Sequence, residues 1–183
     1  DIEDARRVAE TLDIPYYVLN FKDSFGEQVI RRFVDAYTDG ATPNPCVDCN
    51  RYIKFARLME RARELRCDYV VTGHYAQIAY DRGSGRYLLK KGLDESKDQS
   101  YVLYSLTQDQ LAHTLLPLGG LTKAQARQIA GDHGFINAHK RDSQDICFVR
   151  DGDYARFIEE YTGHSFPPGN FVDRQGRVLG RHK

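Results

Sequence analysis

One apolar strand that stops at a Gly-His pair constrains the fold of this chain most. Residues 68–75 read Asp-Tyr-Val-Val-Thr-Gly-His-Tyr, so an apolar run ends at Gly73 and His74. Such a run is typical of a strand in a parallel sheet, and α/β folds bind their ligands at the carboxyl ends of parallel strands. The sequence therefore predicts a ligand-binding edge at Gly73 and His74.

Helical patterns alternate with this strand and with other strand-like segments. Apolar residues recur at spacings of three and four in the predicted helices, which cover residues 2–12, 21–37, 50–65, 97–106, 122–134 and 151–161. A further strand is expected at residues 16–19, and hairpins at 76–90 and 172–178. Strands joined by helices of this length predict a parallel sheet, so the fold class is α/β of Rossmann type.

The composition narrows the class of protein. The 183 residues suffice for one core and the start of a second domain, and we expect the boundary near residues 151–152. Lys and Arg balance Asp and Glu at 26 each, so no global basic field indicates a nucleic-acid partner, although a local patch could. No apolar run approaches the ~20 residues of a membrane span. The chain begins inside a helical pattern and stops without a closing element, which indicates an internal piece of a longer protein.

A proline-rich stretch before a Cys-x-x-Cys pair is the first candidate site. Residues 42–50 read Thr-Pro-Asn-Pro-Cys-Val-Asp-Cys-Asn. The two prolines favour extended geometry at Thr42 and Asn44. The helical pattern that follows predicts a helix from Asn50, and this would place Cys49 at a helix N-terminus, where the helix dipole favours a thiolate.

A second cysteine stretch lies near the expected domain boundary. Cys147 stands between Ile146 and Phe148 in Asp-Ser-Gln-Asp-Ile-Cys-Phe-Val, residues 142–149. These apolar neighbours by themselves favour a buried structural cysteine over a nucleophile. Four cysteines without a repeating framework fit a reducing compartment, where cysteine pairs are catalytic or bind metal.

Four kinds of chemistry are compatible with these cysteines. A structural zinc site would need a second close pair of Cys or His, which the sequence lacks. A thioredoxin-like motif should follow a strand directly, whereas a long helix and two prolines come before this pair. An iron–sulfur cluster could use Cys46, Cys49 and Cys147 with one open iron position. Sulfur transfer between Cys49 and Cys147 is the fourth, and spacing alone does not choose among them.

A basic stripe follows the cysteine pair on the same predicted helix. Lys54, Arg57 and Arg61 lie together beside its apolar side. Such a stripe is either a solvated helix face or a surface that contacts phosphates.

The sequence resembles the bacterial tRNA-specific 2-thiouridylases, the MnmA/TrmU family, over essentially its whole length. The matching blocks are residues 42–45 with 49–50 and 53–55, 72–76, 97–101 with 103–104, 117–119 with 121–123, and 142–144 with 146–148. The resemblance implies a Rossmann-like ATP-pyrophosphatase domain over residues 1–151 and the start of a central tRNA-binding or linker domain over 152–183. It also implies that the family's Ser-Gly-Gly-Val-Asp-Ser-type phosphate loop lies N-terminal to residue 1 and a barrel domain beyond Lys183.

The same resemblance implies a tRNA-uridine 2-sulfurtransferase. The family replaces the C2 oxygen of the wobble uridine with sulfur, after ATP with Mg²⁺ has adenylated that oxygen. Cys147 would carry the sulfur as a persulfide. Cys49, the second catalytic cysteine, would either release the sulfur as hydrosulfide or resolve the persulfide and leave a Cys49–Cys147 disulfide.

Binding residues also follow from the resemblance. Gly73 would contact ATP, and Asn44, Pro45 and Cys46 would surround the target base. His74 and the run Lys97, Asp98 and Gln99 would contact the tRNA. Some members of the family carry Asp in place of Cys46, with an acid/base role, so the role of Cys46 stays open.

The expected setting is that of a cytoplasmic monomer without membrane contact. A cysteine desulfurase or a sulfur-relay protein would supply the sulfur. The alternative function is a non-catalytic iron–sulfur or zinc module that binds tRNA, and in that case Cys46, Cys49 and Cys147 would be metal ligands.

Overall fold

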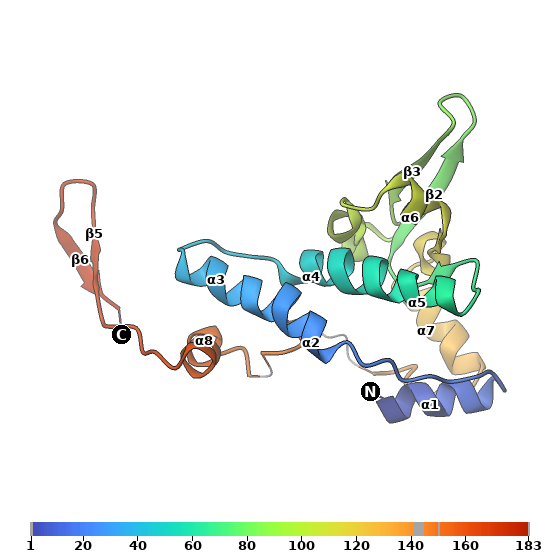
Figure 1. Cartoon of the computed structure of the whole chain (residues 1–183), viewed down its shortest axis with the longest axis horizontal. Helices are drawn as coiled ribbons and strands as arrows, with labels where there is room; N and C mark the ends of the chain where they lie inside the picture. Colours follow the sequence, from blue (N-terminus) through green and yellow to red (C-terminus); the bar gives the residue numbers. More distant parts are fainter. Residues whose placement is uncertain (1, 141–144, 150, 183) are drawn as a thin grey trace. The chain divides into compact units, whose positions relative to one another are not determined.

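The computed structural model describes residues 2–140, 145–149 and 151–182 (Figure 1). The chain forms two compact units, Asp1–Asp142 and Ser143–Lys183. In the first unit the helices are α1 (Ile2–Thr11), α2 (Lys22–Phe25), η1 (Gly26–Arg31), α3 (Arg32–Thr38), α4 (Pro45–Asp48), η2 (Cys49–Arg57), α5 (Leu58–Glu64), η3 (Glu95–Lys97), η4 (Ser100–Leu103), α6 (Gln108–Ala112), η5 (Pro117–Gly120) and α7 (Lys123–Asp132). Its strands are β1 (Val70–Val71), β2 (Ala76–Asp81), β3 (Arg86–Lys91) and β4 (Thr114–Leu115). The second unit holds α8 (Tyr154–Thr162), β5 (Asn170–Val172) and β6 (Val178–Arg181).

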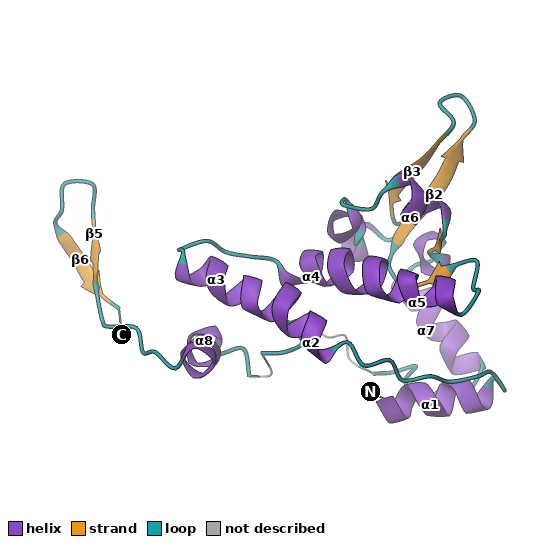
Figure 2. Cartoon of the chain, viewed as in Figure 1, coloured by secondary structure: helices purple, strands orange, loops and turns teal. Residues whose placement is uncertain are grey.

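A parallel strand pair lies where the sequence predicts the ligand-binding edge. Strands β1 and β4 run parallel, with Val70 opposite Thr114 and Val71 opposite Leu115 (Figure 2). The Thr72 N–H continues the pairing by donating to the Leu115 carbonyl oxygen at 3.2 Å. β1 itself ends at Val71, and Gly73 and His74 follow it closely, near the predicted edge. Helices and parallel strands together give an α/β architecture.

The strand predicted at residues 16–19 is wrong, because this segment is irregular. β-propensity expresses how well a side chain fits a pleated, half-buried surface next to other strands. Tyr17 and Val18 are 70% and 58% exposed, and residues 16–19 pair with no strand in the described part of the chain. Without a neighbouring strand the apolar pattern alone does not produce one.

A long helix carries the first cysteine pair. Segments α4, η2 and α5 follow one another without a break, because the residues at both junctions keep helical backbone angles. The helix begins at Pro45, where a missing N–H costs nothing, and the Asn44 side chain caps it. The predicted start at Asn50 is therefore wrong by more than one turn. Phe55 and Met59 on this helix are buried in a core with Val70, Ala76, Val102 and Leu103.

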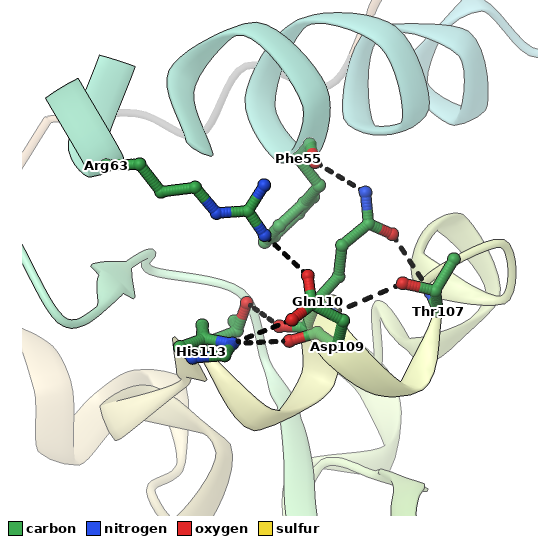
Figure 3. Close-up of polar contacts among 7 residues, drawn as sticks. Phe55, Arg63, Thr107, Asp109, Gln110 and His113 are labelled. Carbon is green, nitrogen blue, oxygen red and sulfur yellow. Dashed lines mark hydrogen bonds and ion pairs between the residues drawn. The ribbon is translucent and has the colours of Figure 1, made fainter. Parts of the chain in front are cut away.

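Helix α6 holds the cysteine helix in place, as Figure 3 shows. The Gln110 side chain donates from Nε2 to the Phe55 carbonyl oxygen at 2.5 Å. Its Oε1 accepts from the Thr107 N–H, which completes a capping box at the start of α6. An ion pair of 2.5 Å joins Arg63, further along the cysteine helix, to Asp109 of α6. These contacts fix the helix against the segment that leads into β4.

Most of the remaining predicted elements are confirmed. Helix α1 covers the predicted 2–12, and the continuous segments α2, η1 and α3 cover the predicted 21–37. The hairpin β2–β3 forms at 76–91, and Thr122 caps α7 through a capping box with Gln125. The predicted helix over 97–106 is instead two short 3-10 turns, η3 and η4, which Asp98 and Gln99 separate.

The second unit is a helix followed by a small hairpin. Asp153 caps α8 by accepting from the Arg156 N–H at 3.0 Å, and β5 pairs antiparallel with β6. Both elements were expected from the sequence, although the helix begins at Tyr154 rather than at 151. The domain boundary at 151–152 stays a prediction. None of the described helices is both long and apolar enough to cross a membrane.

Candidate active site at the strand end and the cysteine loops

Cys46 and Cys49 lie on the first two turns of the long helix. Cys46 is exposed in the first turn, and Cys49 is half-buried in the second, where η2 begins. Residues three apart are neighbours on a helix surface, so both thiols project from one face. The expected position of Cys49 at a helix N-terminus is wrong, because the helix begins earlier at Pro45. It is Cys46 that lies among the first N–H groups, where the helix dipole favours negative charge.

Two asparagines hold the backbone of Cys46. The Asn44 Oδ1 accepts from the Cys46 N–H at 3.1 Å, and the Asn50 Nδ2 donates to the Cys46 carbonyl oxygen at 2.9 Å. Asn50 is only 3% exposed, and its Oδ1 has no hydrogen-bond partner among the described residues. Sequence reasoning missed Asn50 as a site residue, and the available signal was its place directly after Cys49. The pair fixes the turn that the target base was expected to meet.

Arginines cluster around Tyr52 one turn beyond Cys49. The guanidinium carbons of Arg32 and Arg51 lie 5.1 and 5.2 Å from the centre of the Tyr52 ring, within range of a cation–π attraction. Arg32 also pairs with Asp48 at 3.4 Å, next to Cys49. This contact between two helices could not be read from the Cys-x-x-Cys spacing.

His74 is buried at the carboxyl end of β1. It is 6% exposed, and its ring lies 6.1 Å from that of Phe55 on the cysteine helix. Its Nδ1 is hydrogen bonded to the Thr72 hydroxyl at 2.8 Å, which fixes the orientation of the ring. Burial, helped by the positive charge of Lys54, lowers the pKa of His74 to about 4. The imidazole is therefore neutral at physiological pH, and it does not act as a cation toward phosphates.

The neutral state of His74 predicts a pH dependence of stability. The unfolded chain takes up a proton at the ordinary pKa near 6.5, whereas the folded chain resists protonation down to about 4. As the pH falls from 6.5 to 4, the unfolded state binds more protons, so the free energy of unfolding decreases. We expect the melting temperature of the unchanged protein to fall more steeply over this range than that of His74→Gln. If the melting temperatures of the two proteins fell by equal amounts between pH 6.5 and 4, a buried neutral His74 would be wrong.

Gly73 is exposed beside the buried histidine. A Cβ built on Gly73 would touch only Leu118 Cδ1, at 3.5 Å, so the surrounding protein does not require glycine here. The space over this residue is open to a ligand at the strand end. Contact between Gly73 and ATP stays a prediction.

Asp98 and Gln99 use their side chains inside the protein. The Asp98 carboxylate accepts from the Gly92 N–H at 2.8 Å and from the Ser100 hydroxyl at 2.8 Å. Partial burial alone would raise the pKa of Asp98, but these hydrogen bonds outweigh it and lower the pKa. The Gln99 Oε1 accepts from the Tyr75 N–H at 3.1 Å, while the Gln99 N–H donates to the Tyr75 carbonyl oxygen at 2.9 Å. Gln99 thus clamps the residue that follows His74.

The predicted RNA contacts of this run stay untested predictions. The hydrogen bonds of Asp98 and Gln99 within the protein give both residues a structural role that a sequence motif does not reveal. Those of Gln99 hold Tyr75, next to His74, in place. Lys97 ends η3 and is half-buried.

Cys147 belongs to the second unit and is exposed, contrary to the expectation of a buried cysteine. It lies in a turn that the Val149 N–H closes by donating to the Ile146 carbonyl oxygen at 3.0 Å. The buried residue of this turn is instead Val149, while Phe148 is partly buried against α8. Val149 is 3% exposed, and the Phe148 ring lies 5.4 Å from that of Phe157 on α8. The other matching residues of this block, 142–144, lie outside the described residues.

The exposed thiol of Cys147 is thus presented on an anchored turn. The Tyr154 hydroxyl donates to Asp145 at one end of the turn, and Phe148 packs against α8 at the other. A carrier of sulfur must meet both a donor and an acceptor, and an exposed thiol on a fixed turn suits that chemistry.

The described residues contain no ready-made metal site, and Cys147 belongs to a different unit from Cys46 and Cys49. Among residues 2–140, 145–149 and 151–182, no group of three or more His, Cys, Asp or Glu side chains could hold a metal ion. A structural zinc site needs four ligands and an iron–sulfur cluster at least three cysteines. We therefore derive no step of the chemistry from a bound metal or cluster.

The basic stripe after the cysteine pair has local partners. Arg57 pairs with Glu60 at 3.3 Å, and Arg61 pairs with Glu64 at 2.5 Å. Pairs at this spacing are common on solvated helix faces and contribute little energy. The geometry favours the solvated interpretation of the two arginines.

The chain is similar to known proteins along its whole length. A family model described as the tRNA methyl transferase HUP domain matches residues 1–151. The curated tRNA-specific 2-thiouridylase MnmA of Moorella thermoacetica is 55% identical over 182 residues, with 100% of this chain and 51% of the relative covered. Its counterparts in Clostridioides difficile and Geotalea uraniireducens are 52% and 56% identical, with 50% and 48% of their lengths covered. The chain spans about half the length of the curated relatives it matches.

Proposed function

Since this chain belongs to the tRNA methyl transferase HUP-domain family, which confirms the Rossmann-like α/β fold, we propose that it acts in 2-thiolation of tRNA. The observation that carries the proposal is an identity of 52–56% over the whole chain to relatives named tRNA-specific 2-thiouridylase. The family model is named for methyl transfer, but the curated relatives are named for thiolation. A cysteine pair at a helix start and an exposed cysteine on a turn suit the second chemistry.

The proposed reaction exchanges one atom of the wobble uridine. ATP transfers AMP to the C2 oxygen and releases pyrophosphate, which turns that oxygen into a leaving group. The terminal sulfur of a Cys147 persulfide replaces it at C2, and AMP departs with the oxygen. Cys49 then attacks the Cys147 sulfur, the S–S bond to the transferred sulfur breaks, and 2-thiouridine is released with a Cys49–Cys147 disulfide left behind. On the other route Cys49 attacks the persulfide before transfer, which forms the same disulfide and frees hydrosulfide, and hydrosulfide then displaces AMP at C2. On either route an external thiol must reduce the disulfide before the next cycle.

The helix start and the strand end supply the surroundings of the reaction. Asn44, Pro45 and Cys46 form the turn that would receive the target base, and Asn50 holds that turn rigid. Neutral His74, oriented by Thr72, would meet the tRNA as a hydrogen-bonding group rather than as a cation. This division of roles is supported by the hydrogen bonds of Cys46 and His74.

ATP is the proposed co-substrate, and the open position of Gly73 at the end of β1 fits its approach. Mg²⁺ would arrive with the triphosphate, since this ion is usually held by one or two carboxylates together with substrate phosphates. The described residues supply no metal cluster of their own. An iron–sulfur cluster is not part of the proposal.

The proposed organisation and setting follow the sequence. Residues 1–151 would form the catalytic Rossmann-like part, and residues 152–183 would open a central domain that binds tRNA. The partners would be tRNA and a sulfur-donor protein such as a cysteine desulfurase, and the protein would act as a cytoplasmic monomer.

The proposal is tested by reconstitution with the protein as its gene encodes it. An unmodified tRNA transcript, ATP, Mg²⁺, cysteine and a cysteine desulfurase should yield 2-thiouridine and one AMP per thiolated tRNA, measured by mass spectrometry of nucleosides and by nucleotide chromatography. Omission of ATP is the control and should prevent thiolation. A methylated nucleoside formed with S-adenosylmethionine, in place of the thiolated one, would overturn the proposal.

A further inference from the structure

The hairpin β2–β3 carries basic side chains that lack ion-pair partners. Arg82, Arg86 and Lys90 are exposed, and none of them forms an ion pair with any residue that the structure describes. Other basic residues of the first unit do pair with carboxylates, among them Arg57 and Arg61. Residues 76–91 hold four Lys or Arg against one Asp, so the hairpin has a net charge of +3.

Asp81, the single acidic residue of the hairpin, is hydrogen bonded within the turn. The Asp81 carboxylate accepts from the Gly83 and Ser84 N–H groups at 3.2 and 3.1 Å, and from the Ser84 hydroxyl at 2.6 Å. These hydrogen bonds lower the pKa of Asp81 and occupy both of its oxygens. Asp81 therefore shapes the turn and leaves Arg82 and Arg86 without a carboxylate partner on the hairpin.

The hairpin is built as a rigid support. Its register runs without a bulge from Ala76 opposite Lys91 to Asp81 opposite Arg86. The Tyr80 and Tyr87 rings meet across the strands with centres 5.0 Å apart, and such cross-strand aromatic pairs stabilise a sheet. The regular strand pairing and the aromatic pair both limit the motion of the backbone that carries the basic side chains.

Helix α6 braces the free side of the hairpin. The Gln108 side chain accepts from the Tyr87 N–H at 2.8 Å and donates to the Tyr87 carbonyl oxygen at 2.9 Å. It thus supplies the two hydrogen bonds that a third strand would make. In Figure 1 the turn of the hairpin extends beyond α6, and residues 82–86 are all exposed.

The spacing of the cations suits a repeating anion. Residues two apart on a strand share a face, so Arg86 and Lys90 project from the same side, about 13 Å apart at ~3.3 Å per residue. Side chains this far apart reach separate negative groups rather than one. Arginine binds phosphate oxygens bidentately, and a row of regularly spaced phosphates is what a nucleic-acid backbone offers.

We propose that the β2–β3 hairpin is a rigid arm that binds the phosphate backbone of RNA through Arg82, Arg86 and Lys90. That this RNA is the tRNA substrate rests on the proposed function. Lys91 is set apart from the arm because its charge acts on Asp98 inside the protein.

The test compares two triple variants of the protein as its gene encodes it. The first neutralises the arm with Arg82→Gln, Arg86→Gln and Lys90→Gln. The matched control, Arg6→Gln, Arg57→Gln and Arg61→Gln, makes the same change in net charge at arginines that already have glutamate partners. Binding to a fluorescent tRNA transcript is measured by anisotropy from 50 to 300 mM salt, and melting curves verify that each variant folds.

The arm variant should lose two to three units from the slope of log K against log salt, about one per lost phosphate contact. Its affinity at 100 mM salt should fall at least about tenfold, and a variant with Arg82→Lys and Arg86→Lys should keep most of the slope. Equal slopes for the arm variant and the control would overturn the proposal. Binding of an acidic protein to the hairpin would not rescue it, because the proposed ligand is RNA.

The measurement separates this proposal from the proposed function. Salt-dependent binding is recorded without catalysis, so a changed slope supports the arm even if the unchanged protein makes no 2-thiouridine. Conversely, if thiolation is active and the slopes are equal, the proposed RNA-binding role of the hairpin is wrong and the proposed function stands. At saturating tRNA the arm variant should keep its kcat, since the hairpin contributes to binding and not to the reacting atoms.

Discussion

Cys49→Ser and Cys147→Ser are each expected to abolish 2-thiouridine formation while the protein stays folded. A hydroxyl can neither carry a persulfide sulfur nor attack one, so each substitution removes a covalent step rather than a contact. When residues act as one unit, loss of either costs about as much as loss of both. We expect activity to fall at least about a thousandfold in each variant.

The structure predicts that neither substitution unfolds the chain. Cys147 is exposed and Cys49 is half-buried, so replacement by the similarly sized serine leaves no large cavity. Melting curves of both variants should lie close to that of the unchanged protein. In a metal-site protein the same variants would lose metal-linked folding energy and melt together at lower temperature.

Two other cysteines provide the controls for this experiment. Cys67 is exposed and lies outside both cysteine stretches, so Cys67→Ser should keep full activity. Cys46→Asp should stay folded, because a carboxylate in the first helical turn interacts favourably with the helix dipole. It should keep substantial activity, because the resembling family carries Asp at this position in some members. If Cys46→Asp unfolded the protein, or if Cys147→Ser remained active, sulfur transfer between Cys49 and Cys147 would be wrong.

Local sequence patterns predicted those elements whose causes are themselves local. The strand that precedes Gly73, the hairpin at 76–91 and the cap at Thr122 depend on neighbouring residues, and all three form, although the strand already ends at Val71. The predicted start at Asn50 is too late because the apolar side of this helix begins only at Phe55 and gives no signal for the first turns. The cap at Asn44 and the proline at the first helical position, which define the real start, were present in the sequence.

The errors that remain depend on contacts between distant residues. Residues 16–19 have strand-like composition, but no neighbouring strand appears in the described chain, so the segment stays irregular. The exposure of Cys147 follows from the packing of Phe148 and Val149, which only the fold reveals. Likewise, the clamp of Gln99 on Tyr75 joins residues 24 positions apart, and no periodicity reports such a pair.

Among Gly→Ala substitutions in the first unit, Gly119→Ala is expected to lower the free energy of unfolding most. A Cβ on Gly119 would lie 1.8 Å from the Ala76 carbonyl oxygen and 2.6 Å from its carbonyl carbon. Ala76 is fully buried in the core, two residues after His74, so its backbone cannot yield without moving the strand end. Gly92 approaches the same loop, since a Cβ there would lie 2.7 Å from the Tyr75 carbonyl oxygen.

The neighbouring glycine gives a matched control. A Cβ on Gly120 would meet nothing within 4 Å, so Gly120→Ala should be nearly neutral. Overpacking of a core costs about 1–3 kcal/mol and occasionally more, and a backbone clash belongs at the upper end. At roughly 2–4 °C per kcal/mol for a chain of this size, Gly119→Ala should melt about 6–12 °C below Gly120→Ala.

The clash should also reach the chemistry through His74. Gly119 packs closely against the backbone of Ala76, and Gln99 is hydrogen bonded to Tyr75. Both contacts are to residues that directly follow His74, so they help to keep its ring against Thr72. Thiolation by Gly119→Ala, measured well below its melting temperature, should therefore be slower than thiolation by Gly120→Ala. Identical melting temperatures and identical rates would show that the segment 117–120 moves away freely, and that close glycine packing does not position the strand end.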